Sequence, residues 1–366
     1  MREVYAGVMS GTSLDGVDAV VADFAPADGR PCKVLAAAHV PFLQPLRDEL
    51  LALQRAGADE LARAARAANA LADIYTDAIA AALVRARVPT RDVVAAGVHG
   101  QTLRHHPEEG WTLQLNNPAR VAERAGVAVV ADFRGRDVAA GGQGAPLVPA
   151  FHAAIFRGEA HRVVVNLGGI ANLTDLPLQG VVRGFDTGPG SVLLDGWHAR
   201  HRGAAFDRDG AWARSGRVDD SLLSTLLVEP FFARTPPKST GRDLFNGDWL
   251  DAKLAGREFS PVDVQATLMS LTVRTIAEAV CAHCATATEV LVCGGGANNA
   301  ALMDALAGEL APRMVTTTAA HGVAVEHVEA LAFAWLAREA LAGRPGNLPA
   351  VTGARGLRVL GAIYPR

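Results

Sequence analysis

Short apolar runs typical of strands alternate along this chain with longer stretches of helical period. Near the amino end, apolar residues at 4–9 and 17–24 flank a polar turn at 10–16 that contains two glycines, a pattern that predicts a β-hairpin. The segments that follow are predicted, in order, as a strand at 34–40, helices at 45–54 and 59–85, a strand at 93–98, a helix from Pro118 and a strand at 127–131.

The same order of elements restarts in the second part of the chain. Apolar strands at 163–167 and 171–176 flank the turn Gly168-Gly169. The later elements are predicted as a strand at 181–185, a helix at 262–285, a strand at 290–293, a turn at 294–296, and helices at 298–310 and 325–342. Two parts that each open with a glycine-tipped hairpin indicate a duplicated α/β fold.

The length of the chain also favours two domains. Its 366 residues exceed what one hydrophobic core ordinarily serves, so we expect two domains packed around a cleft. Domain 1 is predicted to comprise residues 1–130 and 345–366, and domain 2 residues 131–344. A strand-like stretch at 357–363 is expected to return to the first domain.

Charge and hydropathy argue against several classes of partner. The net charge is −3 with both signs mixed along the chain, which provides no basic field for nucleic acid. The apolar run at 1–9 is short and lacks the basic flank of a signal peptide, and no uninterrupted apolar stretch approaches the roughly 20 residues that span a bilayer. We therefore expect a cytoplasmic protein that binds neither nucleic acid nor membrane.

Cysteine usage agrees with a reducing compartment. Four cysteines in a chain of this length, Cys32, Cys281, Cys284 and Cys293, form no disulfide framework. The pair Cys281-x-x-Cys284 lies at the end of a predicted helix without a second pair at metal spacing, so we expect it to pack rather than to bind zinc or to act in redox chemistry.

The tip of the first hairpin is the first candidate for chemistry. Glycine, serine and threonine at 10–16 can point backbone N–H groups and hydroxyls at a phosphate, although the same residues are common in structural turns. The chain contains no G-x-x-x-x-G-K-[ST] sequence, which excludes a P-loop. A second glycine-tipped hairpin and the turn Gly294-Gly295-Gly296 favour a nucleotide held between duplicated domains.

This arrangement resembles the actin/hexokinase/sugar-kinase superfamily, and the ordered motifs resemble those of the anhydro-N-acetylmuramic acid kinases almost end to end. The motifs are GVMSGTSLDGVD at 7–18, HGQT at 99–102, DFR at 132–134 with GGQGAP at 141–146, NLGGIAN at 166–172, FDTGPG at 185–190, PKSTGR at 237–242, CGGG at 293–296 and Glu329-Ala330 before FAW at 333–335. One departure is Ser191, where the family usually has Asn; a serine there can still cap the helix that follows.

The resemblance implies two actin-like ATPase domains of ribonuclease H-like fold, ATP with Mg²⁺, and a homodimer. It implies hydrolysis of the 1,6-anhydro ring of the sugar coupled to phosphorylation of O6, which gives N-acetylmuramic acid 6-phosphate in cell-wall recycling. The residues expected to bind ATP are Gly11, Thr12, Ser13, Leu14, Asp15, Gly16, Val17, Asp18, Gly168, Gly169, Asn172, Gly294, Gly295, Gly296 and Asn298. No side chain is expected to bind the metal directly, and Asp15 and Asp186 are its indirect partners.

Asp186 is the candidate catalytic base. Water that attacks the anomeric carbon needs a base, and the phosphoryl group can take the place of an acid at the departing oxygen, so one carboxylate can suffice. Asp186 follows a predicted strand and precedes a glycine-rich run, which would expose its carboxylate at a strand end. The alternative is a carboxylate that only shapes a turn or caps a helix.

Three further residues are candidates for binding the sugar. Arg134 can hold the lactyl carboxylate through a two-pronged contact, or can be a solvated or ion-paired charge. Glu329, on a helix with an apolar opposite face, is a sugar contact by resemblance and a salt-bridge partner otherwise. His99 can line the pocket or be a core histidine bonded to backbone.

Other functions keep part of the pattern. Another small-molecule kinase of the superfamily would share the phosphate hairpins but not the motifs around Arg134 and Asp186. An actin-like filament or a chaperone ATPase would need no sugar pocket, and a sugar-kinase-type repressor would need a DNA-binding helix pair before the first hairpin. The metal-dependent members that modify RNA carry paired histidines on one helix, whereas His105 and His106 are adjacent and would face apart on a helix.

Overall fold

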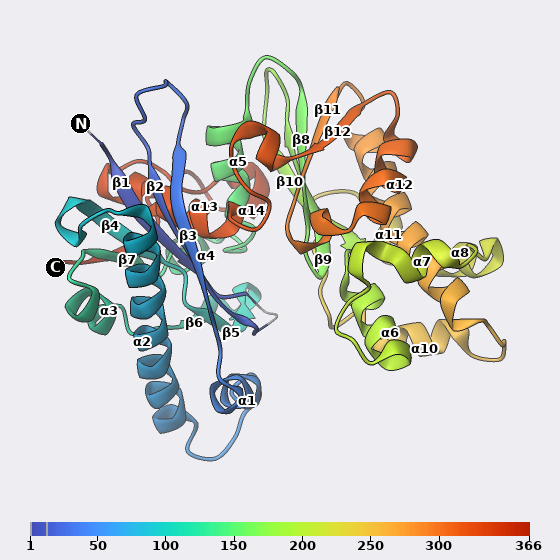
Figure 1. The fold of residues 1–366 in the computed structure, drawn as a ribbon, viewed down its shortest axis with the longest axis horizontal. Coiled ribbons are helices and arrows are strands. Elements are labelled where there is room, and N and C mark those ends of the chain that lie inside the picture. The colour runs from blue at the N-terminus through green and yellow to red at the C-terminus, as the bar shows by residue number, and fades with distance from the viewer. Residues whose placement is uncertain (1, 12–13) are drawn as a thin grey trace. The chain divides into compact units, whose positions relative to one another are not determined.

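A computed structural model describes residues 2–11 and 14–366 and is of mixed α/β type (Figure 1). The chain forms two compact units: unit 1 comprises Met1–Ile155 and His327–Arg366, and unit 2 comprises Phe156–Glu326. Residues 131–155 and 327–344, expected in domain 2, therefore lie in unit 1. Because compact units need not coincide with domains, the domain bounds stay a prediction.

Unit 1 is built on a mixed sheet with the strand order β13-β7-β4-β1-β2-β3. The strands are β1 (Val4–Met9), β2 (Gly16–Asp23), β3 (Lys33–Pro41), β4 (Val93–Val98), β7 (Val129–Ala131) and β13 (Ala362–Tyr364). The first three strands form an antiparallel meander, and β4 and β7 continue the sheet in parallel from β1. The predicted hairpin is confirmed, and the C-terminal strand returns to the first sheet as expected, although it is shorter than the predicted stretch.

Two helices cover opposite faces of this sheet. Helix α2 (Glu60–Ala86) packs on β2 and β3, and α13 (Val328–Leu341) packs on β1 and β4. Side chains on β1 alternate between the faces, so Ala6 and Val8 join the core beneath α2 while Gly7 faces α13. A Cβ added at Gly7 would lie 1.9 Å from the carbonyl oxygen of Ala330, so the glycine lets the helix contact the strand backbone directly.

Helix α2 is long and apolar enough to cross a membrane by length and composition alone. However, 56% of its most apolar window is buried inside the protein, as expected of a core helix. The remaining helices of unit 1 are α1 (Gln44–Ala52), α3 (Pro118–Ala125), α4 (Gly135–Ala139), α5 (Val148–Phe156) and α14 (Pro349–Thr352), with single 3-10 turns η1 (Thr90–Asp92) and η2 (Pro107–Glu109).

A small hairpin in unit 1 was not predicted. Strands β5 (Gln101–His106) and β6 (Trp111–Leu115) pair in antiparallel fashion between the strand predicted at 93–98 and the helix predicted from Pro118, where no element was expected. Strand β5 has one apolar residue, Leu103, and shows no alternation, whereas β6 alternates Trp111, Leu113 and Leu115 with polar residues, a signal that the prediction did not use.

Unit 2 repeats the plan of the first sheet. Its strands are β8 (Arg162–Leu167), β9 (Ile170–Leu176), β10 (Arg183–Pro189), β11 (Glu289–Cys293) and β12 (Met314–Thr317). Their order, β10-β9-β8-β11-β12, places an antiparallel meander beside parallel strands, as β3-β2-β1-β4-β7 does in unit 1. The predicted duplication of the α/β fold is thus confirmed.

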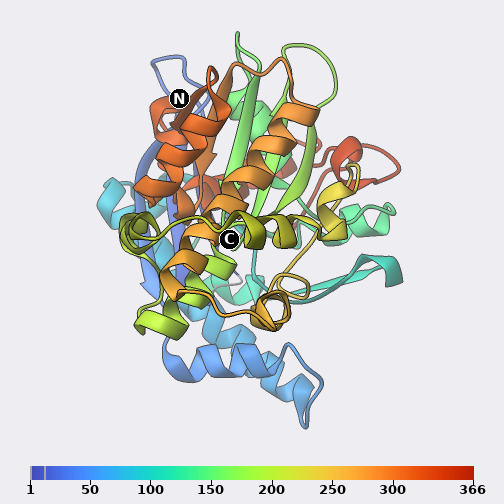
Figure 2. The same cartoon turned by 90° about the vertical axis from the view of Figure 1, so that its right-hand side faces the viewer.

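The helices of unit 2 gather around α11 (Pro261–His283), which packs against β9, β10 and α12 (Figure 2). The others are α6 (Val192–Arg202), α7 (Ala211–Ser215), α8 (Asp220–Leu227), α9 (Pro230–Ala233), α10 (Gly247–Leu254) and α12 (Ala300–Leu310), with 3-10 turns η3 (Arg208–Gly210), η4 (Gly295–Asn298) and η5 (Thr318–His321).

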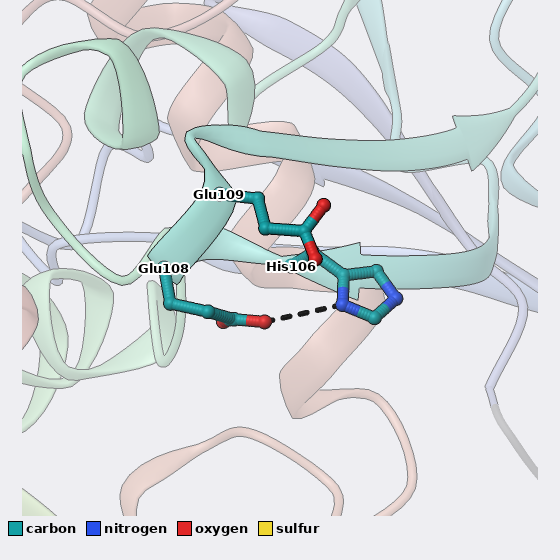
Figure 3. Close-up of side chains that lie close together, drawn as sticks. All are labelled: His106, Glu108 and Glu109. Carbon is teal, nitrogen blue, oxygen red and sulfur yellow. Dashed lines mark hydrogen bonds and ion pairs between the residues drawn. The ribbon is translucent and has the colours of Figure 1, made fainter.

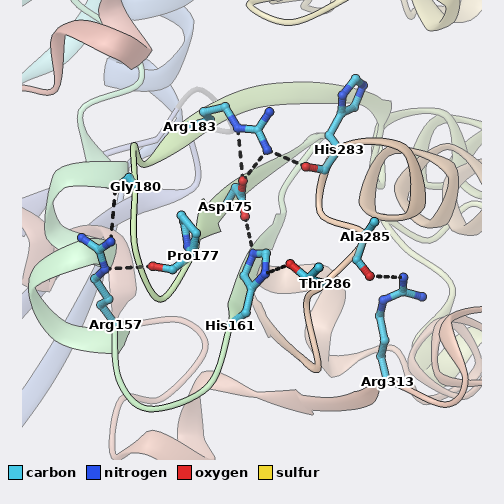
Figure 4. Close-up of polar contacts among 10 residues, drawn as sticks. All are labelled: Arg157, His161, Asp175, Pro177, Gly180, Arg183, His283, Ala285, Thr286 and Arg313. Carbon is cyan, nitrogen blue, oxygen red and sulfur yellow. Dashed lines mark hydrogen bonds and ion pairs between the residues drawn. The ribbon is translucent and has the colours of Figure 1, made fainter.

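A buried polar network anchors the meander of unit 2 to the end of α11 (Figure 4). Asp175 on β9 is 2% exposed and accepts hydrogen bonds from His161 Nε2 at 2.7 Å and from Arg183 Nη2 at 2.6 Å. Arg183 also donates to the carbonyl of His283, and His161 Nδ1 lies 2.8 Å from Thr286 Oγ1. Because its charge is paired with Arg183, the buried carboxylate can join β9, β10 and the residue before β8 to the end of α11.

The Cys-x-x-Cys pair lies beside this network. Cys284 is buried and Cys281 is exposed, and both are free thiols. Burial, followed by the charge of Asp175, raises the pKa of the Cys284 thiol to about 12. A thiol that stays protonated is a poor metal ligand and a poor nucleophile, in line with the expected packing role.

Candidate active site

Asp186 lies on β10, at one end of a row of paired residues that runs across four neighbouring strands of unit 2. The register pairs Asp186 with Asn172 on β9, Asn172 with Asn166 on β8, and Asn166 with Cys293 on β11. The pairing of β10 with β9 shifts between Asp186 and Gly188. Four neighbouring strands therefore bring the second hairpin, the candidate base and the start of the Gly-Gly-Gly turn to one edge of the sheet.

The loop between α9 and α10 holds the carboxylate of Asp186. Oδ2 accepts a hydrogen bond of 2.9 Å from the N–H of Thr240 and one of 3.1 Å from the hydroxyl of Ser239. The N–H of Asp186 in turn donates to the carbonyl of Lys238 at 3.1 Å. Burial raises the pKa of Asp186, and the N–H of Thr240, the hydroxyl of Ser239 and the charge of Lys238 oppose this rise.

Lys238 fixes the other side of the same loop. Its ammonium donates to the carbonyls of Phe231 and Phe232 at 3.3 Å and 3.0 Å and lies 4.8 Å from the centre of the Phe231 ring. The lysine is therefore anchored to α9 and is not a mobile surface charge. Together these contacts hold the carboxylate in place.

The tip of the second hairpin rests on the start of α6. The N–H of Ser191 donates to the carbonyl of Gly168 at 2.9 Å, and the N–H groups of Gly190 and Val192 donate to the carbonyl of Gly169 at 2.9 Å and 3.1 Å. A Cβ added at Gly190 would lie 2.2 Å from the Gly168 carbonyl oxygen. The first N–H groups of the helix, which often bind a ligand, here fix the tip.

Ser191 occupies the N-cap position of α6, but its side chain makes no cap hydrogen bond, so the expected capping role is wrong. The backbone of Ser191 is in the helical region, which turns the hydroxyl away from the helix N–H groups, and the hydroxyl instead interacts with Asp195.

The turn at 294–296 lies directly against the end of β8, next to the tip of the second hairpin. Gly294 has a φ of 82°, and a Cβ there would lie 2.3 Å from Asn166 Oδ1. A Cβ at Gly296 would lie 2.7 Å from the Cβ of Leu167, whereas Gly295 has nothing within 4 Å. The structure therefore brings the two predicted nucleotide elements of unit 2 together, with the Gly295 backbone left open beside them.

Asn298 and Asn299 differ in their roles at the end of this turn. Asn298 is exposed in η4, whereas Asn299 caps α12 by accepting the N–H of Leu302 at 3.0 Å. The side chain of Asn298 is therefore accessible to a ligand, as its predicted contact with ATP requires, whereas the side chain of Asn299 is already used as the helix cap.

The first hairpin of unit 1 is held from behind by β4 and β5. Ser10 Oγ lies 3.0 Å from the hydroxyl of Tyr75 on α2 and 3.3 Å from the carbonyl oxygen of Gly100. Gln101 donates from Nε2 to the carbonyl of Gly11 at 3.2 Å. These buried contacts fix the start of the tip.

Several predicted ATP residues at this tip can contact a ligand only through their backbone. Leu14 and Val17 are buried in the core of unit 1, and a Cβ at Gly16 would lie 2.5 Å from a β3 carbonyl oxygen. The carboxylate of Asp18 lies 2.9 Å from Nδ1 of His39. Two more of the predicted residues lie outside the described part of the chain, namely Thr12 and Ser13.

Arg134, His99 and Glu329 come together in unit 1. Arg134 donates from Nε to His99 Nε2 at 2.9 Å and from Nη1 to the carbonyl of Gly144 at 2.7 Å. Burial lowers the pKa of Arg134 to about 10, while the negative charges of Glu329 and Asp137 act in the opposite direction. The guanidinium is thus held by the protein at both Nε and Nη1, and Nη2 makes no hydrogen bond within the described residues.

His99 is a buried residue that accepts a hydrogen bond from Arg134. It is 3% exposed, and its ring centre lies 4.6 Å from that of Phe333 on α13. Burial, and after it the charge of Arg134, lowers the pKa of His99 well below its usual value. The imidazole is therefore neutral and accepts the Arg134 N–H, a partner that neither alternative for His99 had included.

The comparisons with known proteins show the family of the chain. A model of the family described as anhydro-N-acetylmuramic acid kinase matches residues 3–366. The chain belongs to this family. A relative of that description from Paraburkholderia xenovorans is 56% identical over 370 residues, covering 99% of this chain and 98% of the relative. Another, from Bordetella petrii, is 57% identical over 366 residues, covering 99% and 96%.

A solved structure with a similar backbone is the activator of the 2-hydroxyisocaproyl-CoA dehydratase from Clostridium difficile with bound ADPNP. It is 12% identical, covers 91% of this chain and 93% of its own, and has a TM-score of 0.46. A likeness this distant bears on neither substrate nor mechanism.

The kinase also contains site residues to which the sequence analysis gave no role. Ser239 and Thr240 hold the candidate base, and Arg242 lies beside the second hairpin, with Nη2 3.6 Å from where a Cβ of Gly169 would be. All three stand in the motif at 237–242, so the resemblance marked the segment. Its distance of about fifty residues from Asp186 in sequence concealed the contact.

A third cluster of polar side chains stands on the β5–β6 hairpin (Figure 3). The ligand atoms of His106, Glu108 and Glu109 all lie within 4.8 Å of one another, and His106 Nδ1 is 3.1 Å from Glu108 Oε1. His105 instead lies 2.8 Å from Thr112 Oγ1. The two histidines are on a strand rather than a helix, and their side chains leave opposite faces, so they form no joint metal site.

Proposed function

We propose that the chain phosphorylates 1,6-anhydro-N-acetylmuramic acid with ATP while water opens the anhydro ring, giving N-acetylmuramic acid 6-phosphate and ADP. Water adds to the anomeric carbon as the bond from that carbon to O6 breaks, and O6 takes the γ-phosphoryl group. The proton of the water passes to Asp186 and then to solvent. The product would return a sugar of the cell wall to cytoplasmic metabolism.

The observation that carries this proposal is the setting of Asp186. Its carboxylate is held from one side by Thr240 and Ser239, and burial raises its pKa toward the range that suits a general base. A base that is held in this way can orient one water for attack, which supplies part of the rate by positioning alone.

The ATP phosphates are assigned to the two hairpins and the adenosine side to the turn at 294–296. A Cβ at Gly295 would have nothing within 4 Å, and one at Gly168 or Gly169 would meet its nearest neighbour only at 3.5 Å or 3.6 Å, which leaves these backbones open to close approach by phosphate. Mg²⁺ would accompany the nucleotide. The carboxylates of Asp15 and Asp186 would accept hydrogen bonds from the water molecules bound to the ion and would not bind it directly.

The sugar is assigned to Arg134, Glu329 and His99. Arg134 would bind the lactyl carboxylate with Nη2 and the second proton of Nη1, because Nε and one Nη1 proton are already engaged. Glu329, in the first turn of α13, would accept hydrogen bonds from the sugar. His99 would act by orienting Arg134. A homodimer is proposed as the working form.

The experiment is turnover with Mg-ATP and the anhydro-sugar in oxygen-18 water, read by mass spectrometry. We expect one oxygen-18 in the phosphorylated sugar from the wild type, and almost no product from Asp186→Asn, which keeps the size of the side chain and removes the base. Asp220→Asn, at an exposed helix start in unit 2, is the matched control and should turn over normally. Phosphorylation of a different acceptor only, without label, would favour another sugar kinase.

A further inference from the structure

Asp137 lies at the centre of a buried hydrogen-bond network in unit 1. Its side chain, on α4, is completely buried. Oδ2 accepts the N–H of Gly144 at 2.8 Å, and Oδ1 accepts Asn347 Nδ2 at 2.7 Å and Thr352 Oγ1 at 2.8 Å. A buried carboxylate with three donors is costly to build and costly to disturb, so its position is well defined.

The network ties two distant parts of the sequence together. On one side is the glycine loop at 141–146, and on the other the segment after α13 that contains Asn347 and Thr352. The N–H of Gln143 donates to the carbonyl of Thr352 at 2.7 Å, and the N–H of Arg355 donates to that of Ala140 at 2.9 Å. The start of the glycine loop and the residue before it are therefore held against the C-terminal segment, directly ahead of Gly144.

Gly144 connects this network to Arg134. Its N–H donates to Asp137, and its carbonyl accepts Arg134 Nη1 at 2.7 Å. Gly144 has a φ of 65°, and a Cβ there would lie 2.7 Å from Val138 Cγ2, so the residue has little room to move. Any displacement of its N–H moves the carbonyl that orients the guanidinium.

We propose that Asp137 is a positioning residue for the acidic sugar: through Gly144 it sets the direction in which Arg134 presents its remaining donors to the substrate carboxylate. This inference rests on the proposed function, because it takes Arg134 as the carboxylate ligand. The hydrogen bonds of the Asp137 side chain go to Gly144, Asn347 and Thr352, none of which is assigned to the nucleotide, so its effect falls on sugar binding.

Asp137→Asn tests the link with a side chain of the same size. An amide that keeps its oxygen toward Asn347 and Thr352 turns its NH₂ group toward the N–H of Gly144, and two donors repel. We expect the KM for the anhydro-sugar to rise about ten-fold or more, since a hydrogen bond to a charged group is lost, while the KM for ATP stays within two-fold.

Thr352→Val is the matched control. It removes one hydrogen bond from Oδ1 and leaves the Oδ2 contact with Gly144, so a purely structural network would respond to both variants alike. We expect Thr352→Val to lower the melting temperature without raising the KM for the sugar. Equal increases in KM for both variants, or none for Asp137→Asn, would overturn the proposal.

A double-mutant cycle with Arg134→Ala separates this inference from the proposed function. If Asp137 acts through Arg134, Asp137→Asn adds no further rise in KM once the arginine is gone. Additive increases in KM would contradict the link. If Asp137→Asn proves weakly folded, Gly144→Ala can replace it in the cycle, since it keeps the carboxylate and displaces the same carbonyl. A wild-type enzyme that does not turn over the sugar would instead refute the proposed function.

Discussion

The N–H of Thr240 donates a hydrogen bond of 2.9 Å to Oδ2 of Asp186, so a loop between two helices stabilises a charge on the edge strand β10. Burial acts against that charge and prevails, which raises the pKa of Asp186. The strength of the base is therefore set jointly by how deeply the strand is buried and by a loop far from it in sequence.

The pH dependence of activity should reveal this balance. The base works as a carboxylate, so kcat/KM rises with pH through a pKa above that of an ordinary aspartate. Ser239→Ala removes a hydrogen bond that favours the charged form and should move the acid limb to higher pH. Ser224→Ala, an exposed serine on α8, should leave the limb in place. A pH profile identical for all three proteins would contradict the assignment.

Arg242 should contribute to the use of ATP. Its exposed guanidinium lies beside Gly169 at the hairpin assigned to phosphate, where it can meet developing negative charge. We expect Arg242→Ala to lower kcat/KM for ATP by about ten-fold or more. Arg274→Ala, which removes an exposed arginine paired with Glu278 and Glu309, should have little effect. Steady-state kinetics in both substrates makes the comparison, and equal effects would exclude a specific role.

Gly97 should be intolerant of any side chain. A Cβ there would lie 1.9 Å from the carbonyl oxygen of Phe333, so Gly97→Ala must push α13 away from β4. We expect a loss of about 1–3 kcal/mol in the free energy of unfolding, as for other overpacked cores. Gly308→Ala, in α12 with nothing within 4 Å, should instead stabilise by about 0.5–1 kcal/mol. Urea titration measures both, and a neutral Gly97→Ala would disprove the direct contact.

His152 should make unit 1 less stable in acid. The side chain is 1% exposed on α5, and burial lowers its pKa from 6.5 to about 3. Between these values the unfolded chain binds a proton that the folded chain does not, so this contribution to stability falls as the pH falls below about 6.5, by up to about 1.4 kcal/mol per pH unit. His152→Gln should flatten the dependence. If His152 plays no part, the unfolding free energies of the wild type and of His152→Gln will decline in parallel across this pH range.

The sequence predicted those elements whose residues carry a strong local pattern. Both glycine-tipped hairpins, α2, α11 and the turn at 294–296 have apolar periods or glycine runs that mark them. The β5–β6 hairpin was missed because β5 has no apolar alternation, although β6 does, and the short helices α7 to α9 have too few turns to show a period.

The site was predicted in its parts but not in its contacts. Asp186 and Arg134 stand in motifs, yet what tunes them, Thr240 for the one and His99 with Gly144 for the other, depends on chain segments that only the fold brings together. Proximity in space between residues distant in sequence leaves no mark on local composition.

The direct contact of α13 with the sheet has a consequence for how this family can vary. Because the spacing at Gly7 and Gly97 is set by main-chain atoms, it does not depend on which apolar side chains fill the rest of the core. Glu329 lies in the first turn of α13, so the distance of this residue from the strands is also set by the main-chain contacts. Apolar core residues can therefore be substituted without moving Glu329, provided that positions 7 and 97 remain glycine.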